Sequence, residues 1–189
     1  MLSEKNQIRA RAKQFRDQLQ VMPDWADEAA DIFLSAVQVK QDAIVSVYYP
    51  VKSEIDPSPI VEKLWGRGVT VCLPIINADR RDLSFSKWDK STKLVHASFG
   101  VFEPEDKTPL LEPDILIIPL LAFDQTGNRM GYGQGHYDET LRILRAKKDV
   151  LAVGLAYAEQ AVLLALPAEP HDQKLDMVVT PQRVFDFRA

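Results

Sequence analysis

Short apolar runs alternate along this chain with longer stretches in which apolar residues recur at helical spacing. Five runs are almost continuously apolar and rich in β-branched residues, a pattern that predicts buried strands. They lie at residues 43–50 (AIVSVYYP), 69–75 (VTVCLPI), 114–121 (DILIIPLL), 150–157 (VLAVGLAY) and 175–180 (LDMVVT), the last strand that the pattern predicts. LSFSKW at 83–88 predicts a shorter strand, and loops and small strands are expected from there to Pro113.

The N-terminal residues show helical spacing twice. Ser3 can cap a first helix that extends to about Val21. Its inward stripe is expected to be Ile8, Ala12, Phe15 and Leu19, flanked by Lys5, Arg9 and Arg16. After Pro23 and Asp24, a second helix is expected to bury Trp25, Ala29, Ile32, Phe33, Ala36 and Val37.

Two further helices are predicted between the strands. Ser58 and Pro59 are typical of a helix cap and first position, and Gly66 or Gly68 ends that helix. Its buried face is expected to be Ile60, Val61, Leu64 and Trp65. The segment 137–148 (YDETLRILRAKK) predicts the last helix, with the stripe Tyr137, Leu141 and Leu144.

Alternation of buried strands with helices favours an α/β fold. We expect a mostly parallel central sheet with helices on both faces, in three layers. Internal repeats, low-complexity tracts and Gly- or Ser-rich linkers are absent from the sequence. One domain covering residues 1–189 is therefore the simplest expectation.

Composition and charge narrow the class of protein. The chain is 46% hydrophobic and 26% charged, as in ordinary globular proteins, and its net charge of -4 disfavours a nucleic-acid-binding protein. Cys72 is the only cysteine and lies in an apolar run, so we expect a buried thiol and a reducing compartment. Neither a secretory signal nor a membrane span is predicted, and the expected location is the cytoplasm.

The segment Gly127–Asp138 (GNRMGYGQGHYD), called here the glycine segment, holds four of the chain's eight glycines. It follows the predicted strand at 114–121, so it is expected at the carboxyl edge of the sheet, where α/β proteins bind ligands. Glycines let backbone N–H groups approach an anion, Arg129 adds a guanidinium, and a helix starting near His136 adds its positive end. These features favour a phosphate site, with a merely tight loop as the alternative.

Common phosphate-binding motifs do not describe this segment. It lacks the Gly-Lys-Ser/Thr ending of a Walker loop. The sixth position of GYGQGH is His136 rather than the glycine of a dinucleotide-binding loop. A following valine strand and an HRD-type segment are missing too, which argues against a kinase loop.

Two carboxylates and two cations are candidates for the same chemistry. Asp138 and Asp172 offer oxygen ligands for Mg²⁺, although a first-turn acid and a turn residue are ordinary alternatives. Lys5 and Arg9 are one helical turn apart and project together, either into solvent or over a triphosphate. His96, His136 and His171 lack metal-ligand spacing and are expected to be ordinary polar residues.

Five separated segments resemble one family in its own order. They are KNQIR at 5–9, YYPVKSEID at 48–56, FGVFEP at 99–104, the glycine segment, and HDQKLDMVVT at 171–180. On these segments the chain resembles 5-formyltetrahydrofolate cyclo-ligases, also called 5,10-methenyltetrahydrofolate synthetases. The resemblance spans nearly the whole chain, and the glycine segment is its most specific part.

The resemblance implies an ATP- and Mg²⁺-dependent cyclisation of 5-formyltetrahydrofolate to 5,10-methenyltetrahydrofolate, with release of ADP and phosphate after phosphorylation of the formyl oxygen. By position, Lys5 and Arg129 would be catalytic, and Asp138 and Asp172 would hold Mg²⁺. ATP would be contacted by Lys5, Arg9, Arg129, Gly131, Tyr132, Gly133, Gln134, Gly135, His136 and Tyr137. The folate would be contacted by Tyr49, Glu54, Tyr132, Gly133, Gln134, Gly135 and His136. The expected partners are these two small molecules, without nucleic acid or membrane, and the expected state is a monomer.

The glycine segment departs from the commoner GYGGGYYD form of the family at two positions. Gln134 replaces a glycine, which indicates that this position tolerates a side chain. His136 replaces a tyrosine, so the family's aromatic contact is not carried over at this position. Two other functions stay open at this stage. One is a folate- or nucleotide-binding module without turnover, and the other is an enzyme such as a sugar-phosphate isomerase or acyltransferase that ignores ATP.

Overall fold

The computed structural model describes residues 3–97 and 100–188. Phe99, the first residue of the FGVFEP segment, and Ala189, the end of the expected domain, lie outside the described residues. Within this part of the chain no helix is both long and apolar enough to cross a membrane.

A seven-stranded sheet runs through the molecule in the order β11-β10-β9-β6-β1-β2-β3. From edge to edge the strands are Val184–Asp186, Met177–Val179, Leu151–Leu155, Ile115–Pro119, Ile44–Ser46, Thr70–Ile76 and Leu83–Lys87. The five inner strands are parallel, and β3 and β11 pair antiparallel at the two edges. The expectation of a mostly parallel α/β sheet is confirmed.

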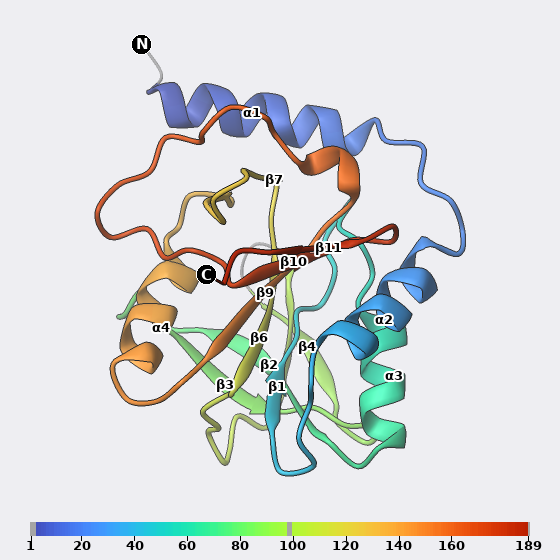
Figure 1. Cartoon of the computed structure of the whole chain (residues 1–189). Coiled ribbons are helices and arrows are strands. Elements are labelled where there is room, and N and C mark those ends of the chain that lie inside the picture. Colours follow the sequence, from blue (N-terminus) through green and yellow to red (C-terminus); the bar gives the residue numbers. More distant parts are fainter. Residues whose placement is uncertain (1–2, 98–99, 189) are drawn as a thin grey trace.

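Helices cover both faces of this sheet, as the alternating pattern predicted (Figure 1). Helices α2 (Trp25–Ala36) and α3 (Ser58–Gly66) pack on one face, and α4 (His136–Arg145) packs on the other. Helix α1 (Glu4–Asp17) lies across one end of the molecule, beside the hairpin of β7 (Ala122–Phe123) and β8 (Arg129–Met130). A second small hairpin joins β4 (Leu94–His96) and β5 (Phe102–Pro104), and a 3₁₀ turn covers Ala158–Gln160.

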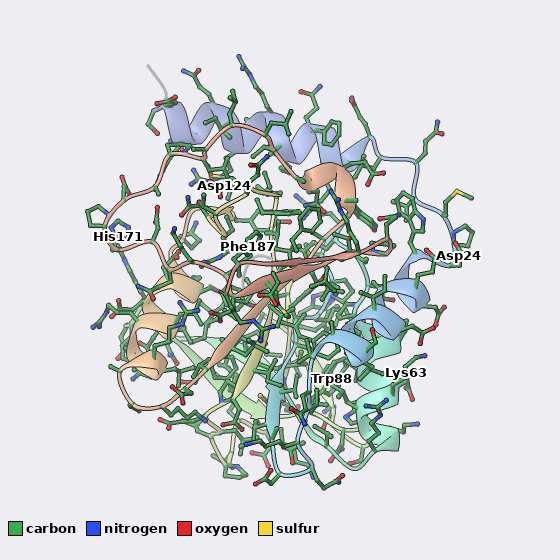
Figure 2. All side chains as sticks on the ribbon, in the orientation of Figure 1. Asp24, Lys63, Trp88, Asp124, His171 and Phe187 are labelled. Atoms are coloured by element: carbon green, nitrogen blue, oxygen red, sulfur yellow. The ribbon has the colours of Figure 1, made fainter. Side chains whose placement is uncertain are left out.

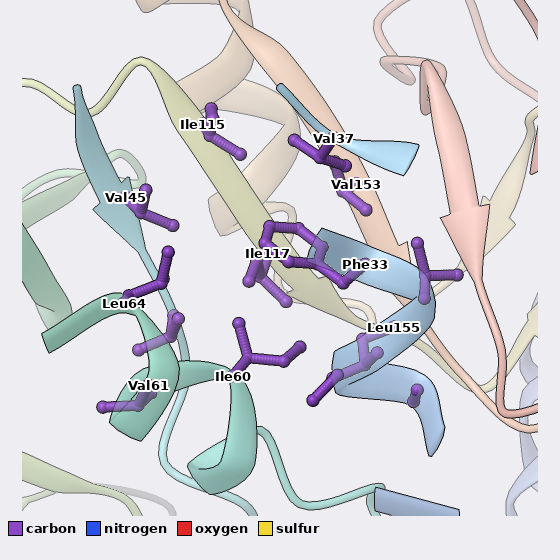
Figure 3. Close-up of a cluster of buried hydrophobic side chains, with 14 of the residues drawn as sticks. Phe33, Val37, Val45, Ile60, Val61, Leu64, Ile115, Ile117, Val153 and Leu155 are labelled. Carbon is purple, nitrogen blue, oxygen red and sulfur yellow. The ribbon is translucent and has the colours of Figure 1, made fainter. Parts of the chain in front are cut away.

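The core on the α2–α3 face is built from the apolar stripes of the two helices (Figure 3). Phe33 of α2 and Ile60 and Leu64 of α3 are fully buried against the sheet. Each fully buried side chain of this size contributes about 1.5–3 kcal/mol of transfer free energy. The apolar core formed with these two helices therefore buries one whole face of the parallel strands whose carboxyl ends carry the following loops.

The structure corrects several boundaries. Helix α1 ends at Asp17 rather than near Val21, and Phe15 is 48% exposed instead of packing inward. Arg16 takes the inward position, because its guanidinium finds buried oxygen partners there. The predicted cap Ser58 is itself the first helical residue and makes no cap hydrogen bond.

The apolar pattern failed to predict two elements. The strand at 177–179 is not the last, because β11 follows it and pairs with it through a short turn. The start of the glycine segment belongs to the β7–β8 hairpin, whose turn is built around Asp124. Both elements are too short to show a period of their own.

Candidate functional site

A pocket of about 460 Å³ opens at the carboxyl edge of the parallel strands. Its walls come from α1, from the loops that follow β1 and β6, from the glycine segment and from the loop at 167–172. Every residue that the sequence placed in a site is among those that line it: Lys5, Arg9, Tyr49, Glu54, Arg129, Gly131, Tyr132, Gly133, Gln134, Gly135, His136, Tyr137, Asp138 and Asp172. The fold therefore gathers segments that are up to 167 residues apart.

Helix α1 is held on the glycine segment through Arg9. The Nε of Arg9 donates to the carbonyl oxygen of Gly131 at 2.9 Å. Gly133 has a φ of +96°, and a Cβ placed there would lie 2.8 Å from Cζ of Arg9. Position 133 is glycine for two reasons, its left-handed backbone and the close approach of this guanidinium.

Lys5 bridges two carboxylates on the loop at 167–172. Its Nζ lies 2.7 Å from Oδ2 of Asp172 and 3.0 Å from Oε2 of Glu169. Partial burial lowers the pKa of Lys5, but the hydrogen bonds to these carboxylates outweigh it and the net shift is upward. The pKa of Asp172 is lowered overall, because its bonds to Lys5 and to the Glu169 backbone outweigh its desolvation.

Arg129 and Asp138 form a second ion pair in the same pocket. The Nη2 of Arg129 lies 2.8 Å from Oδ1 of Asp138, and its Nη1 donates to the carbonyl oxygen of Gln173. The backbone N–H of Gln173 donates back to Oδ1 of Asp138 at 2.9 Å. This junction joins β8, the first turn of α4 and the residue that follows Asp172.

Glu169, His171 and Asp172 form a group whose ligand atoms all lie within 4.8 Å of one another. His171 sits at the margin of the molecule on its loop (Figure 2). Two of the three side chains are carboxylates, the ligands that Mg²⁺ prefers, so the donor set fits that ion. Asp138 does not belong to this group among the described residues. It lines the pocket separately, paired with Arg129.

A second set of side chains, centred on Glu54, lines another part of the pocket. Oε1 of Glu54 accepts the Tyr132 hydroxyl at 2.8 Å, and Oε2 accepts the backbone N–H of Val51 at 2.8 Å. Desolvation raises the pKa of Glu54 against these hydrogen bonds and the nearby Arg16. Desolvation and the Glu54 charge raise the pKa of Tyr132 to about 12, so its hydroxyl is a donor at neutral pH. Tyr49 adds an aromatic wall, with its ring 4.8 Å from that of Phe102.

The start of α4 turns its N-terminal end toward the pocket. Its N-cap is Gly135, with a φ of +74°, so no side chain occupies the cap position. The first N–H groups of a helix lack intrahelical acceptors and attract anions. His136 lines the pocket too, and its Nδ1 lies 2.7 Å from the Arg81 carbonyl oxygen. Gln134 is exposed, which agrees with the expectation that this position tolerates a side chain.

Sequence reasoning missed two side chains of the site. The helical pattern places Arg16 at the flank of the inward stripe, although it lies seven residues after Arg9 and therefore on the same helix face. Glu169 has no such pattern around it, although only Pro170 separates it from the HDQKLD segment. Neither residue carries a local signal comparable to the glycine segment.

Comparison with known proteins agrees with the resemblance read from the sequence. A profile described as the 5-formyltetrahydrofolate cyclo-ligase family matches residues 1–181. The 5-formyltetrahydrofolate cyclo-ligase of Escherichia coli is 34% identical over 169 residues, which are 87% of this chain and 92% of that protein. The Haemophilus influenzae protein of the same name is 32% identical over 178 residues, 90% of this chain and 94% of that one.

A solved structure shows the same fold. The 5,10-methenyltetrahydrofolate synthetase of Aquifex aeolicus superposes with a TM-score of 0.80 at 25% identity. The match covers 99% of this chain and 94% of that one.

Proposed function

The chain belongs to the 5-formyltetrahydrofolate cyclo-ligase family, and from this premise we propose that it converts 5-formyltetrahydrofolate and ATP to 5,10-methenyltetrahydrofolate, ADP and phosphate. We place both ligands in the pocket of about 460 Å³. We also propose that the chain forms one domain and acts as a monomer. The observation that supports this most is the meeting of Lys5, Arg9 and Arg129 with a glycine-rich backbone and a helix N-terminus in that pocket.

The chemistry requires a better leaving group on the formyl carbon. The formyl oxygen attacks the γ-phosphorus of ATP, and ADP departs. Nitrogen 10 of the folate then attacks the activated carbon, the carbon–oxygen bond breaks to release phosphate, and nitrogen 10 loses its proton. In such a reaction the protein chiefly positions two ligands and stabilises phosphoryl charge.

We assign the cationic end of the pocket to the triphosphate. There Lys5 and Arg129 are paired with Asp172 and Asp138. The phosphates of ATP offer both cations new partners, which frees the two carboxylates for a hard cation. Asp172, with Glu169 beside it, and Asp138 would then be the residues that hold Mg²⁺, which when bound would supply positive charge next to the transferring group.

We assign the end with Glu54, Tyr132 and Tyr49 to the folate. A carboxylate fixed by two hydrogen bonds can accept the two adjacent N–H groups of the pterin ring. The aromatic ring of Tyr49, backed by that of Phe102, offers apolar surface to the rest of the ligand. The glycine segment lies between the two ends and can contact both ligands.

Glu54→Gln is expected to raise the dissociation constant of 5-formyltetrahydrofolate about 10- to 100-fold, because one hydrogen bond to a charged acceptor is worth roughly 1.5–3 kcal/mol. The dissociation constant of ATP should change much less. Isothermal calorimetry with each ligand separately measures both. Glu62→Gln is the control, since Glu62 is exposed and pairs with Lys90 on the surface. Equal weakening of both ligands would contradict the assignment of Glu54 to the folate end.

Gly133→Ala is expected to raise the KM for ATP about tenfold, because the new Cβ must displace the Arg9 guanidinium 2.8 Å away. It should also lower the free energy of unfolding by about 1–2 kcal/mol through its left-handed backbone. Gly68→Ala is the control, because Gly68 has a φ of +73° and meets only the end of the Gln41 side chain. A Gly68→Ala protein with the same rise in KM would show that backbone strain alone is responsible.

The proposed function is tested by near-ultraviolet absorbance of the purified protein with 5-formyltetrahydrofolate and Mg²⁺, with and without ATP. Growth of the methenyl chromophore only with ATP is the expected result. Folate binding without growth would favour the binding module, and turnover of another substrate without ATP would favour the isomerase or acyltransferase.

A further inference from the structure

Arg16 is a fully buried arginine at the folate end of the pocket, and nothing in the mechanism above uses it. Its side chain is 1% exposed, and it lies on α1, whereas its partners come from three other parts of the fold. A buried guanidinium is costly unless its N–H groups find acceptors. The partners of Arg16 therefore indicate which groups it holds in place.

The three nitrogens of the Arg16 guanidinium each reach a different segment. Nε donates to the Ser53 hydroxyl at 3.1 Å, and Nη1 donates to the Leu120 carbonyl oxygen at 3.2 Å. Nη2 donates to the Tyr132 hydroxyl at 2.6 Å. The planar fork of one arginine thus ties α1 to the loop after β1, to the residue after β6 and to the glycine segment.

Arg16 also approaches Glu54, both directly and through Tyr132. Nη1 of Arg16 lies 3.8 Å from Oε1 of Glu54, the same oxygen that accepts the Tyr132 hydroxyl. Arg16, Tyr132 and Glu54 therefore form a closed chain in which Arg16 donates to Tyr132 and Tyr132 donates to Glu54. Because the Tyr132 hydroxyl accepts from Arg16, its own proton points to the Glu54 carboxylate. This hydrogen bond in turn sets the orientation in which Glu54 meets a ligand.

We propose that Arg16 is a positioning residue for the folate subsite, which orients Tyr132 and keeps the Glu54 carboxylate ionised and aimed into the pocket. The inference rests on the proposed function, because it assigns Glu54 to the folate. Arg16 itself acts through Tyr132 and Glu54 rather than by touching the ligand. It also makes the folate end depend on the docking of α1, the helix that carries Lys5 and Arg9 to the ATP end.

The electrostatics around Glu54 support this role. Desolvation raises the pKa of Glu54, and the Val51 N–H, the Tyr132 hydroxyl and the Arg16 charge lower it. Tyr48 and Tyr137 also face Glu54, and burial, more than the Glu54 charge, raises the pKa of both. If folate binding needs an ionised Glu54, binding is present above the pKa of Glu54 and is lost as the pH falls through that pKa. Without Arg16 the pKa of Glu54 rises further, so the loss of binding should occur at a higher pH.

The first test compares Arg16→Met, Arg16→Lys and the control Arg11→Met, since Arg11 is an exposed arginine on the same helix. Equilibrium binding of 5-formyltetrahydrofolate without ATP is measured across pH, alongside binding of ATP alone. Arg16→Met should raise the folate dissociation constant about 10- to 100-fold and move the acidic loss of binding to higher pH. Arg16→Lys should weaken folate binding without moving that pH, and Arg11→Met should leave folate binding unchanged.

The second test is a double-mutant cycle with Glu54→Gln. If Arg16 acts through Glu54, Arg16→Met should add little to the folate defect of Glu54→Gln. Additive defects, or equal weakening of ATP and folate binding, would overturn the inference. If thermal melting shows that Arg16→Met is not folded, the double-mutant cycle of Arg16→Lys with Glu54→Gln decides the same question. Failure of the wild-type protein to form product would contradict the proposed function alone, because this inference is read from binding.

Discussion

Replacing Arg129 with alanine is expected to lower kcat about 10²–10³-fold, which is the usual cost of removing one charge contact to a transition state. Arg129 is the most deeply buried of the three cations assigned to the triphosphate, with a side chain only 6% exposed. A buried guanidinium acts in a low dielectric, where its attraction for a developing phosphoryl charge is strong. We therefore expect this variant to have one of the two largest effects.

Structural damage must be separated from the loss of catalysis in this variant. Arg129 also donates to Asp138 and to the Gln173 carbonyl, so its removal takes one donor from each, although Asp138 keeps the Gln173 N–H. Arg129→Lys keeps the charge without the fork, and should recover part of kcat. Arg142→Ala is the control, since Arg142 is exposed on α4 and pairs only with Glu139 among the contacts described. If Arg129→Ala melted normally and turned over at close to the wild-type rate, its assigned role would be wrong.

The second large effect is expected for Asp138→Asn, in the concentration of Mg²⁺ that the enzyme needs. Asparagine keeps an oxygen that can accept from Arg129 and from the Gln173 N–H, so the junction of β8, α4 and residue 173 should persist. The lost charge should raise the half-saturating Mg²⁺ concentration about tenfold or more, because Mg²⁺ is held mainly by carboxylates and phosphates. Titration of initial rates with Mg²⁺ at fixed ATP measures this directly.

Glu139→Gln supplies the matched control for that titration. Glu139 is the next residue on the same helix turn, but it pairs with Arg142 at the surface. Its replacement removes the same charge from the same helix end and should leave the Mg²⁺ requirement unchanged. Identical Mg²⁺ curves for wild type and Asp138→Asn would refute metal binding by Asp138.

The glycine segment could be recognised from sequence because its signal is local. Four glycines, an arginine and a helix start lie within twelve residues, and the preceding apolar strand places them at the carboxyl edge of the sheet. The strand order could not be read in the same way, since the pairing of β1 between β2 and β6 depends on packing between distant segments.

The ion pairs of the site were not predictable from local pattern. Lys5 and Asp172 are 167 residues apart and meet only because α1 crosses the end of the molecule. The helical pattern also predicts the wrong position for Arg16. An amphipathic pattern assigns arginine to solvent, so Phe15 was expected inside, whereas the buried acceptors around Arg16 reverse the two positions.

Phosphorylation of the formyl oxygen is the central claim, and the fate of that oxygen tests it most directly. 5-Formyltetrahydrofolate carrying a heavy-oxygen label in its formyl group is turned over with unlabelled ATP and Mg²⁺, and the released phosphate is analysed by mass. The account predicts one labelled oxygen in each phosphate, formed together with each ADP and each methenyl product. Unlabelled phosphate, with the heavy oxygen recovered in water, would contradict it.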